Sequence, residues 1–186
     1  YTVNQIKKAG KILIIEPDNE DALKILSFWR STHEKPLNYA CTFVEKYSKR
    51  ISKNYIIAHR LKRTNSIIKK LKRFNTEGMQ LTTMQDIGGC RVILDNINNV
   101  NRLVNSLNHS EYFELRNNYI ENPKEDGYRS VHLKGNFIIN DIKRQIELQV
   151  RTKIQHSWAT AVEIVDLFTK QYLKHNQGDE KWKIFF

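Results

Sequence analysis

The sequence lacks several features that would assign it to a common class of protein. Its only cysteines, Cys41 and Cys90, are too few for a disulfide framework in a chain of 186 residues. No apolar run approaches the roughly 20 residues of a membrane span, and the N-terminus lacks the residue order of a signal peptide. These absences argue against a secreted mini-protein or a membrane protein, and they favour a reducing, cytoplasmic setting.

Phosphate and metal motifs built on glycine or cysteine are also missing. The patterns G-x-x-x-x-G-K-[ST] and G-x-G-x-x-G are absent, as are H-E-x-x-H and cysteine pairs at zinc spacing. A glycine-rich backbone loop for phosphates is therefore not expected. If phosphates bind to this chain, side chains must hold them.

The sequence does carry a large excess of positive charge. Lys and Arg number 31 against 20 Asp and Glu, which gives a formal net charge of +11. Such an excess indicates a polyanionic partner, whether nucleic acid, nucleotide phosphates or an anionic lipid. A basic surface kept for solubility is the alternative.

Apolar periodicity predicts an α+β domain in which helices come first and a mixed sheet follows. Residues 1–53 are predicted to be helical, with a helix start at Asp18-Asn19 and a break at Lys35-Pro36. The core at 54–170 is predicted to have strands at 55–62, 90–94, 112–120, 128–139 and 143–151, the last two joined by a turn at Asn140-Asp141, and helices at 65–74, 97–107 and 152–170. Two of these helices have a clear apolar face, formed by Val100, Leu103, Val104 and Leu107 in the first and by Ile154, Trp158, Ala161, Val162, Val165 and Phe168 in the second. The tail at 171–186 ends in apolar residues, so it either packs on the body or leads into a further domain.

Alternation along strands brings polar side chains together. Glu147, Gln149 and Arg151 alternate with apolar residues, so they share one face of a predicted strand. Arg60 and Lys62 lie two residues apart on an earlier strand and share a face in the same way. The exposed face of an antiparallel sheet would show the same pattern.

The helix predicted after the first strand extends this basic cluster. Ser66, Lys70 and Arg73 share one face of that helix. The N-terminus of a helix adds about half a positive charge of its own. A polyphosphate could bind there, and a solvated basic helix is the alternative.

Two further segments place an acid and an aromatic ring beside cations. Asp86 precedes Gly88-Gly89 and Arg91, where glycines allow a ligand close to the backbone and the acid could hold a divalent metal. An ordinary turn before a strand is the alternative. Tyr128 and His132 share a predicted strand face, where the tyrosine could stack on a nucleobase. A cross-strand aromatic pair would look the same.

Together these segments describe a site for two nucleotides and Mg²⁺. Asp86 and Glu147 supply the hard oxygen ligands that Mg²⁺ prefers, and the nearby cations would neutralise phosphates. Phosphoryl-type transfer depends mainly on positioning and electrostatic stabilisation, so this set of residues is chemically sufficient.

Four segments in this order resemble the synthetase domain of the RelA/SpoT family. They are residues 60–71, Asp86-Ile87-Gly88-Gly89-Cys90-Arg91-Val92-Ile93, residues 123–132 and residues 146–159. The resemblance covers about Tyr55 to Glu163 and implies a nucleotidyltransferase-like mixed sheet flanked by helices. It also implies transfer of the β,γ-pyrophosphate of ATP to a ribose 3′-hydroxyl.

The resemblance implies a role for each residue on the donor side. Arg60 and Arg91 would sandwich the adenine of ATP. The rest of the ATP-binding set, in which the cations hold the phosphates, is Lys62, Ser66, Lys70 and Arg73. Asp86 and Glu147 would bind Mg²⁺, and Glu147 would also activate the acceptor hydroxyl.

On the acceptor side, the resemblance implies that Tyr128 stacks on the base. The residues expected near it are Lys124, His132, Gln149 and Arg151. With GDP or GTP as acceptor, the product would be (p)ppGpp, the alarmone of the stringent response. Toxin-type relatives modify the 3′-CCA end of tRNA instead, which the positive charge also suits, and a non-catalytic RNA-binding module is a third reading.

The sequence departs from the pattern of the family in two ways. It has no His-Asp dipeptide, so the hydrolase activity of the longer family members is not expected. The acidic motif of the family ends here in Gly88-Gly89, which keeps the acid and the final glycine. The toxin-type reading also implies a C-terminal inhibitory domain or an antitoxin partner.

Overall fold

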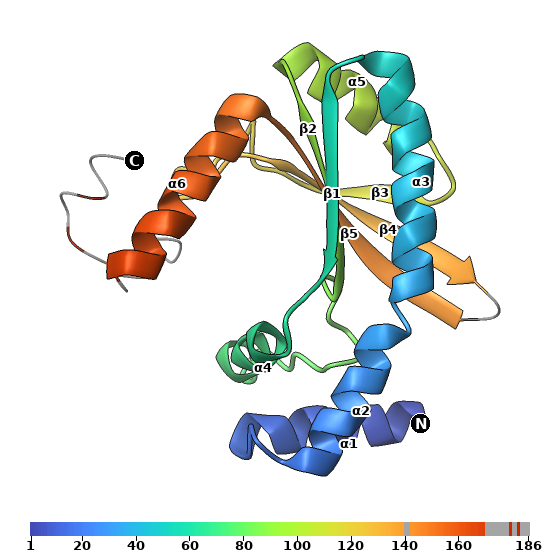
Figure 1. Cartoon of the computed structure of the whole chain (residues 1–186), viewed down its shortest axis with the longest axis vertical. Helices are drawn as coiled ribbons and strands as arrows, with labels where there is room; N and C mark the ends of the chain where they lie inside the picture. Colours follow the sequence, from blue (N-terminus) through green and yellow to red (C-terminus); the bar gives the residue numbers. More distant parts are fainter. Residues whose placement is uncertain (140–141, 170–178, 180–181, 183–186) are drawn as a thin grey trace. The chain divides into compact units, whose positions relative to one another are not determined.

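A computed structural model describes residues 1–139 and 142–169, together with residues 179 and 182 (Figure 1). Its strands form one mixed sheet in the order β1-β2-β5-β4-β3, with β1 and β3 at the edges. The elements are α1 (Val3–Ile15), α2 (Glu20–Ser31), α3 (Glu34–Ile51), β1 (Tyr55–Leu61), α4 (Thr64–Arg73), β2 (Gly88–Leu94), α5 (Ile97–Asn108), β3 (Phe113–Asn118), β4 (Val131–Ile139), β5 (Ile142–Thr152) and α6 (Lys153–Thr169). The predicted α+β class is confirmed.

The N-terminal region is helical as predicted, but the break predicted at Lys35-Pro36 is wrong. Helix α2 begins after Asn19, whose side chain accepts a hydrogen bond from the Ala22 amide at 3.1 Å. The helix ends at Ser31, and Pro36 lies in the first turn of α3. Proline is tolerated in a first turn because that position needs no amide donor.

Two strand starts differ from the prediction. Gly88-Gly89 belongs to β2 and is not a turn before it. A Cβ atom on Gly88 would lie 2.7 Å from Cδ1 of Ile146, so a larger residue at this position would force the end of that β5 side chain to move. Strand β4 begins at Val131, which places Tyr128 in the preceding loop and not on the strand.

The apolar face predicted for α6 is covered only in part, because Val162 is buried and Trp158 and Val165 are half-buried. Its buried residues are Ala159 and Val162, whereas Ile154 and Phe168 are 82% and 81% exposed. The turn predicted at Asn140-Asp141 and nearly all of the tail at 171–186 lie outside the described residues. Within the described part of the chain, no helix has the length and hydropathy needed to cross a membrane.

Contacts divide the chain into two compact units. Unit 1 comprises residues 1–43, 59–90 and 134–147, and unit 2 comprises residues 44–58, 91–133 and the described residues from 148 onward. These boundaries do not follow the segments at 1–53, 54–170 and 171–186 into which the sequence was divided. Most strands contribute residues to both units, so each unit draws on several distant parts of the sequence.

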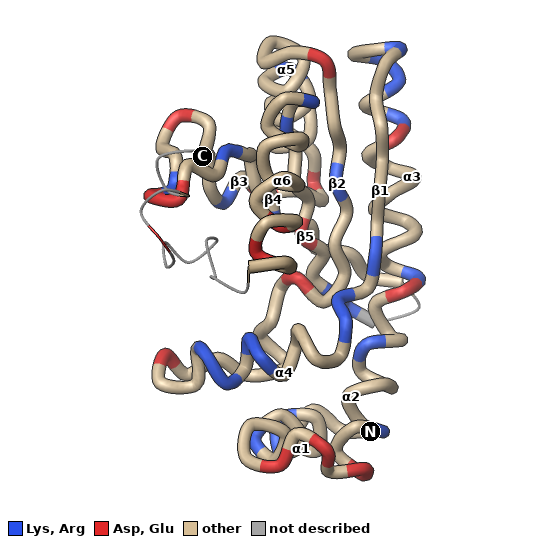
Figure 2. Tube along the Cα trace, turned by 60° about the vertical axis from the view of Figure 1, so that its left-hand side comes forward, with Lys and Arg blue, Asp and Glu red and all other residues tan. Residues whose placement is uncertain are grey.

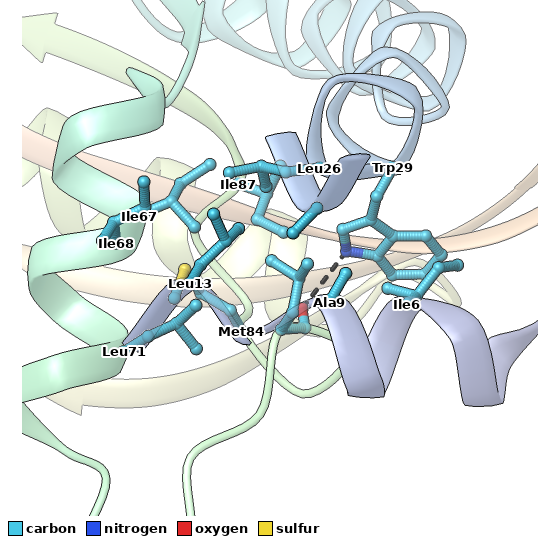
Figure 3. Packing of buried hydrophobic residues seen from close by; sticks show 12 residues of the cluster. Ile6, Ala9, Leu13, Leu26, Trp29, Ile67, Ile68, Leu71, Met84 and Ile87 are labelled. Carbon is cyan, nitrogen blue, oxygen red and sulfur yellow. Dashed lines mark hydrogen bonds between the residues drawn. The ribbon is translucent and has the colours of Figure 1, made fainter. Parts of the chain in front are cut away.

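Unit 1 is organised around a hydrophobic cluster formed by α1, α2, α4 and the loop before β2 (Figure 3). The indole Nε1 of Trp29 donates a hydrogen bond to the Leu81 carbonyl at 3.2 Å, which ties α2 to that loop. The buried residues that α4 contributes are Ile67, Ile68 and Leu71. Met84 and Ile87 are buried on either side of Asp86. The N-terminal helices therefore fix both α4 and the loop that carries Asp86.

Unit 2 contains helix α5 and the loop that carries Tyr128. The predicted apolar positions of α5 are buried: Val100, Leu103, Val104 and Leu107. Ser130 is fully buried, and its hydroxyl donates a hydrogen bond to the Val150 carbonyl at 3.2 Å. This bond ties the loop to β5 two residues after Tyr128.

Candidate active site

Two lysines of unit 1 converge on a single carboxylate oxygen. The Nζ atoms of Lys62 and Lys70 lie 2.8 Å and 2.9 Å from Oδ2 of Asp86. Lys62 follows β1, Lys70 lies on α4, and Asp86 lies in the loop before β2. The side chains are 23%, 24% and 15% exposed, so this cluster is largely shielded from water. The fold thus brings together three of the predicted site residues from distant segments.

The charges of this cluster favour an anion. Burial alone would raise the pKa of Asp86, but Lys62 and Lys70 outweigh burial and hold that pKa below its ordinary value. Asp86 is therefore ionised at neutral pH. One carboxylate faces two ammonium groups, and each ammonium has three N–H donors. Net positive charge and unused donors remain for a phosphate.

The second carboxylate oxygen of Asp86 is suited to bind the predicted metal ion. Oδ1 is buried and has no hydrogen-bond partner among the described residues. A buried carboxylate oxygen without a partner is destabilising, and a divalent cation would satisfy it. The donor is a hard oxygen, as Mg²⁺ prefers, so Asp86 fits the role of a Mg²⁺ ligand.

Glu147, the second predicted metal ligand, lies half-buried on β5 in the same unit. Its neighbours Ile146 and Leu148 are fully buried, which confirms the predicted alternation along the strand. The described residues form no cluster of three or more acidic, histidine or cysteine side chains that would hold a metal alone. Mg²⁺ is commonly held by one or two carboxylates and the phosphates of its substrate, so two acids suffice.

The remaining residues predicted to bind ATP in unit 1 are exposed. Ser66 and Arg73 lie on α4, and Arg60 lies on the edge strand β1. The guanidinium carbon of Arg73 lies 4.4 Å from the centroid of the Phe74 ring. The apolar face of α4 is buried and Lys70 contacts Asp86, whereas Lys69, Lys72 and Arg73 are exposed. Figure 2 shows these Lys and Arg positions along the helix.

In unit 2, Arg91 and Gln149 form a bidentate contact. Nε and an Nη atom of Arg91 donate to Oε1 of Gln149 at 3.2 Å and 3.1 Å. These residues lie on the neighbouring strands β2 and β5. The family resemblance places Arg91 on the donor and Gln149 on the acceptor, so the structure links one residue of each predicted set.

Tyr128 and His132 lie in an aromatic cluster of unit 2. The Tyr128 hydroxyl lies 2.9 Å from Nε2 of His132. The Tyr119 ring lies edge-on to both, with centroid distances of 6.0 Å to Tyr128 and 5.2 Å to His132. The Lys124 ammonium lies 4.7 Å from the Tyr119 centroid and 5.2 Å from that of Tyr128. This arrangement is compatible with aromatic side chains that simply pack together and also with a Tyr128 ring that stacks on a nucleobase.

Arg151 does not share the half-exposed position of Glu147 and Gln149, because only 2% of its surface is exposed. Burial lowers its pKa to about 10, and the positive charge of Arg91 acts in the same direction. Its Nη2 atom lies 2.8 Å from Nδ1 of His156. Its Nε is buried and has no hydrogen-bond partner among the described residues. Arg151 is therefore a buried cation whose side chain contacts His156.

The Arg151 contact also sets the tautomer of His156. A guanidinium group only donates hydrogen bonds, so Nδ1 of His156 must be the acceptor and the neutral ring carries its proton on Nε2. Burial lowers the pKa of His156, and Arg151 and Arg91 lower it further. His156 therefore offers a fixed N–H donor at neutral pH.

Two residues of this region were missed as site candidates. His156 lies inside a recognised segment, but its role depends on a buried arginine that spacing cannot reveal. Tyr119 follows β3 and meets Tyr128 only through the fold. The sequence signal that could have identified Tyr119 as a site candidate is an aromatic residue at the end of a predicted strand.

Residues 59–166 match the family model described as the region found in RelA / SpoT proteins. The chain belongs to the RelA/SpoT family. The match spans more than half of the chain and agrees with the region, about Tyr55 to Glu163, in which the four motif segments were recognised.

Two relatives from Bacillus subtilis (strain 168) illustrate the similarity within the RelA/SpoT family. The GTP pyrophosphokinase YwaC is 34% identical over 113 residues, which are 54% of this chain and 52% of that protein. The GTP pyrophosphokinase YjbM is 29% identical over 110 residues, which are 56% of this chain and 52% of that protein. The chain therefore spans about half the length of the curated relatives it matches.

Solved structures of small alarmone synthetases from Bacillus subtilis show the same fold. Small alarmone synthetase 1 matches with a TM-score of 0.69 and 22% identity, over 83% of this chain and 82% of the other. Small alarmone synthetase 2 matches with a TM-score of 0.63 and 24% identity, over 88% and 87%. The predicted mixed sheet flanked by helices is therefore the fold of RelA/SpoT synthetases.

Proposed function

We propose that this protein is a pyrophosphokinase that transfers the β,γ-diphosphate of ATP to the 3′-hydroxyl of GDP or GTP, with (p)ppGpp as product. The convergence of Lys62 and Lys70 on one oxygen of Asp86, with the other oxygen unpartnered, carries the proposal. Such a cluster offers cations to a polyphosphate and a carboxylate oxygen to its metal. Family membership and the relatives named GTP pyrophosphokinases support it.

The donor is assigned to the cations of unit 1. Lys62 and Lys70 would hold the phosphates that travel, with Ser66 and Arg73 of α4 next to them on the surface. Arg60 and Arg91 are assigned to the adenine on the strength of the family resemblance. Mg²⁺, when held by Asp86 and Glu147, would offset the negative charge of the phosphates and orient them.

The transfer step assigns Glu147 as general base. Its carboxylate would accept the proton of the acceptor 3′-hydroxyl, and the hydroxyl oxygen would form a bond to the β-phosphorus of ATP. The bond between the β-phosphorus and the bridging oxygen of the α-phosphate would break, so that AMP leaves with that oxygen. Lys62 and Lys70 would stabilise the charge that spreads over the transferred group.

The acceptor is assigned to unit 2. Tyr128 would stack on the base, beside the Lys124 ammonium and the His132 ring. The Nε2–H of His156, fixed by Arg151, would donate to an acceptor atom on the base edge. The structure of small alarmone synthetase 1 bound to its product pppGpp, which matches with a TM-score of 0.68, supports a guanosine nucleotide.

The 3′ end of tRNA is the second candidate acceptor, because a net charge of +11 suits a large polyanion. The basic tail invoked for this acceptor lies outside the described residues. The cytoplasmic setting and any C-terminal regulatory or antitoxin partner also stay predictions.

ATP labelled in the γ-phosphate distinguishes these functions, because that phosphate travels with the transferred group. The protein and Mg²⁺ are incubated with GDP, GTP or bulk tRNA in parallel. Label on the guanosine nucleotides is the expected result, and label on tRNA alone would make the protein a translation-blocking enzyme. Label on none of them would overturn the transferase proposal and leave an RNA-binding module.

Matched variants show whether this site carries the activity. Glu147→Gln should abolish labelling, whereas Glu114→Gln should not, because Glu114 lies on the edge strand β3 with 60% of its side chain exposed. Equal losses in the two variants would mean that the effect is not specific to Glu147.

A further inference from the structure

The two cysteines of the chain lie together in unit 1, although they are far apart in the sequence. Cys41 lies on α3 and Cys90 lies on β2, and both are thiols. They are 8% and 2% exposed. Hydrogen bonding by Cys90 lowers the pKa of the Cys41 thiol. The transfer reaction proposed above uses neither residue.

The packing of α3 on β2 explains why the thiols meet. Leu37, one helical turn before Cys41, has its Cβ 3.7 Å from the point where a Cβ on Gly88 would lie. Four residues of helix advance by about 6 Å and two residues of strand by about 6.6 Å. Moving from Leu37 to Cys41 and from Gly88 to Cys90 therefore covers nearly the same distance. The contact of Leu37 with Gly88 therefore indicates that Cys41 lies beside Cys90, which agrees with the effect of Cys90 on the pKa of Cys41.

We propose that Cys41 and Cys90 are a redox-active pair that closes into a reversible intramolecular disulfide when the protein meets peroxide. The bond would tie α3 to β2, the strand that follows Asp86 and carries Arg91. The packing of α3 on β2 brings the two side chains together, and the bond requires the two sulfur atoms to approach to about 2.05 Å.

The order of the two steps follows from exposure and charge. Cys41 is the more exposed thiol, and the hydrogen bond from Cys90 lowers its pKa although burial opposes this. The Cys41 thiolate would attack one oxygen of hydrogen peroxide, break the O–O bond and become a sulfenic acid, with the first water released. The Cys90 sulfur would then attack the Cys41 sulfur and release the second water. Two thiols and one peroxide give one disulfide and two waters.

The experiment exposes the reduced, folded chain to hydrogen peroxide and then denatures it in the presence of an alkylating reagent. Intact mass should show the joint loss of both alkylatable thiols in monomeric protein, reversed by dithiothreitol. Cys90→Ala should stop at a sulfenic acid on Cys41 that dimedone traps. The folded chain should form the bond about 10³-fold more readily than the urea-unfolded chain, because the fold has already closed the loop between the cysteines.

Several results would overturn the inference. One is that the wild-type protein keeps both thiols at a peroxide concentration that oxidises Cys41 in the Cys90→Ala variant. Others are oxidation to sulfinic acid without a disulfide, and disulfides that form only between chains. An oxidised protein that unfolds at a lower urea concentration than the reduced protein would also contradict it, since a pre-aligned pair closes without strain. Thiol state and urea midpoint are read without the transfer reaction, so they test the inference whether or not the proposed function holds.

Discussion

Replacing Asp86 by asparagine should strengthen the binding of metal-free ATP and abolish the gain in affinity that Mg²⁺ provides. In the wild-type protein, a phosphate that approaches Lys62 and Lys70 must share them with the Asp86 carboxylate, which lies 2.8 Å and 2.9 Å from the two ammonium groups. That carboxylate also repels the phosphate unless a cation lies between them. The substitution keeps the shape of the side chain but removes its charge, so the lysines are released to metal-free ATP while a ligand of the metal is lost.

The size of the change in ATP affinity follows from the number of lysine N–H donors that Asp86 occupies and that the phosphate gains in the variant. Asp86 occupies one of the three N–H donors on each lysine, and a hydrogen bond to a charged group is worth about 1.5–3 kcal/mol. A phosphate can use the remaining donors, so only part of that energy opposes binding. We expect metal-free ATP to bind Asp86→Asn roughly tenfold more tightly, about 1.4 kcal/mol, as one decade in affinity requires.

Isothermal titration with ATP, with and without Mg²⁺, measures both effects. The wild-type protein should bind ATP more tightly with Mg²⁺, and Asp86→Asn should lose that gain. Asp95→Asn is the matched control, since Asp95 pairs with Lys153 in unit 2, outside the predicted site. The reasoning is refuted if Asp86→Asn weakens metal-free ATP and Mg²⁺–ATP equally.

Three further outcomes are expected. Glu147→Gln should lower turnover at least about 100-fold while the binding of metal-free ATP and the melting temperature stay near wild type; near-normal turnover would exclude it as the base. Tyr128→Ala should raise KM for GDP about tenfold or more and leave KM for ATP within about twofold, because stacking is worth about 1–3 kcal/mol; equal changes would contradict the acceptor assignment. Burial holds the pKa of His33 at about 4, against 6.5 in the unfolded chain, so only the unfolded chain gains this proton as pH falls through 6.5. The free energy of unfolding should lose roughly 3 kcal/mol between pH 7 and pH 4, and urea titrations of His33→Gln should lack this part of the slope unless the assignment is wrong.

The sequence predicted best those elements whose apolar period coincides with real burial. Helix α5 was placed to within a residue because Val100, Leu103, Val104 and Leu107 are all covered. The alternation along β5 likewise located Glu147 and Gln149 on one face. Periodicity shows which residues share a face, but not whether another element covers it. The face predicted for α6 is exposed at Ile154 and Phe168 for that reason.

The residue types of the candidate site were also predictable, but their arrangement was not. Lys62, Lys70 and Asp86 come from three segments, and only packing of α4 and the loop before β2 against the N-terminal helices brings them to one oxygen. The family resemblance implies that Arg151 lies beside the acceptor, and strand alternation puts it on the face of Glu147 and Gln149, but neither shows what lies above the sheet. Its burial and its contact with His156 depend on how α6 follows β5.

The fate of the nucleotide donor tests the central claim most directly. A transfer of diphosphate breaks the bond next to the α-phosphate, so each molecule of product must be accompanied by one molecule of AMP. Ion-exchange chromatography of a reaction with ATP, GDP and Mg²⁺ measures both. The account predicts AMP and a guanosine product with two added phosphates in equal amounts, and none of that product from 3′-deoxy-GDP. Release of ADP, or of orthophosphate without a modified acceptor, would contradict it.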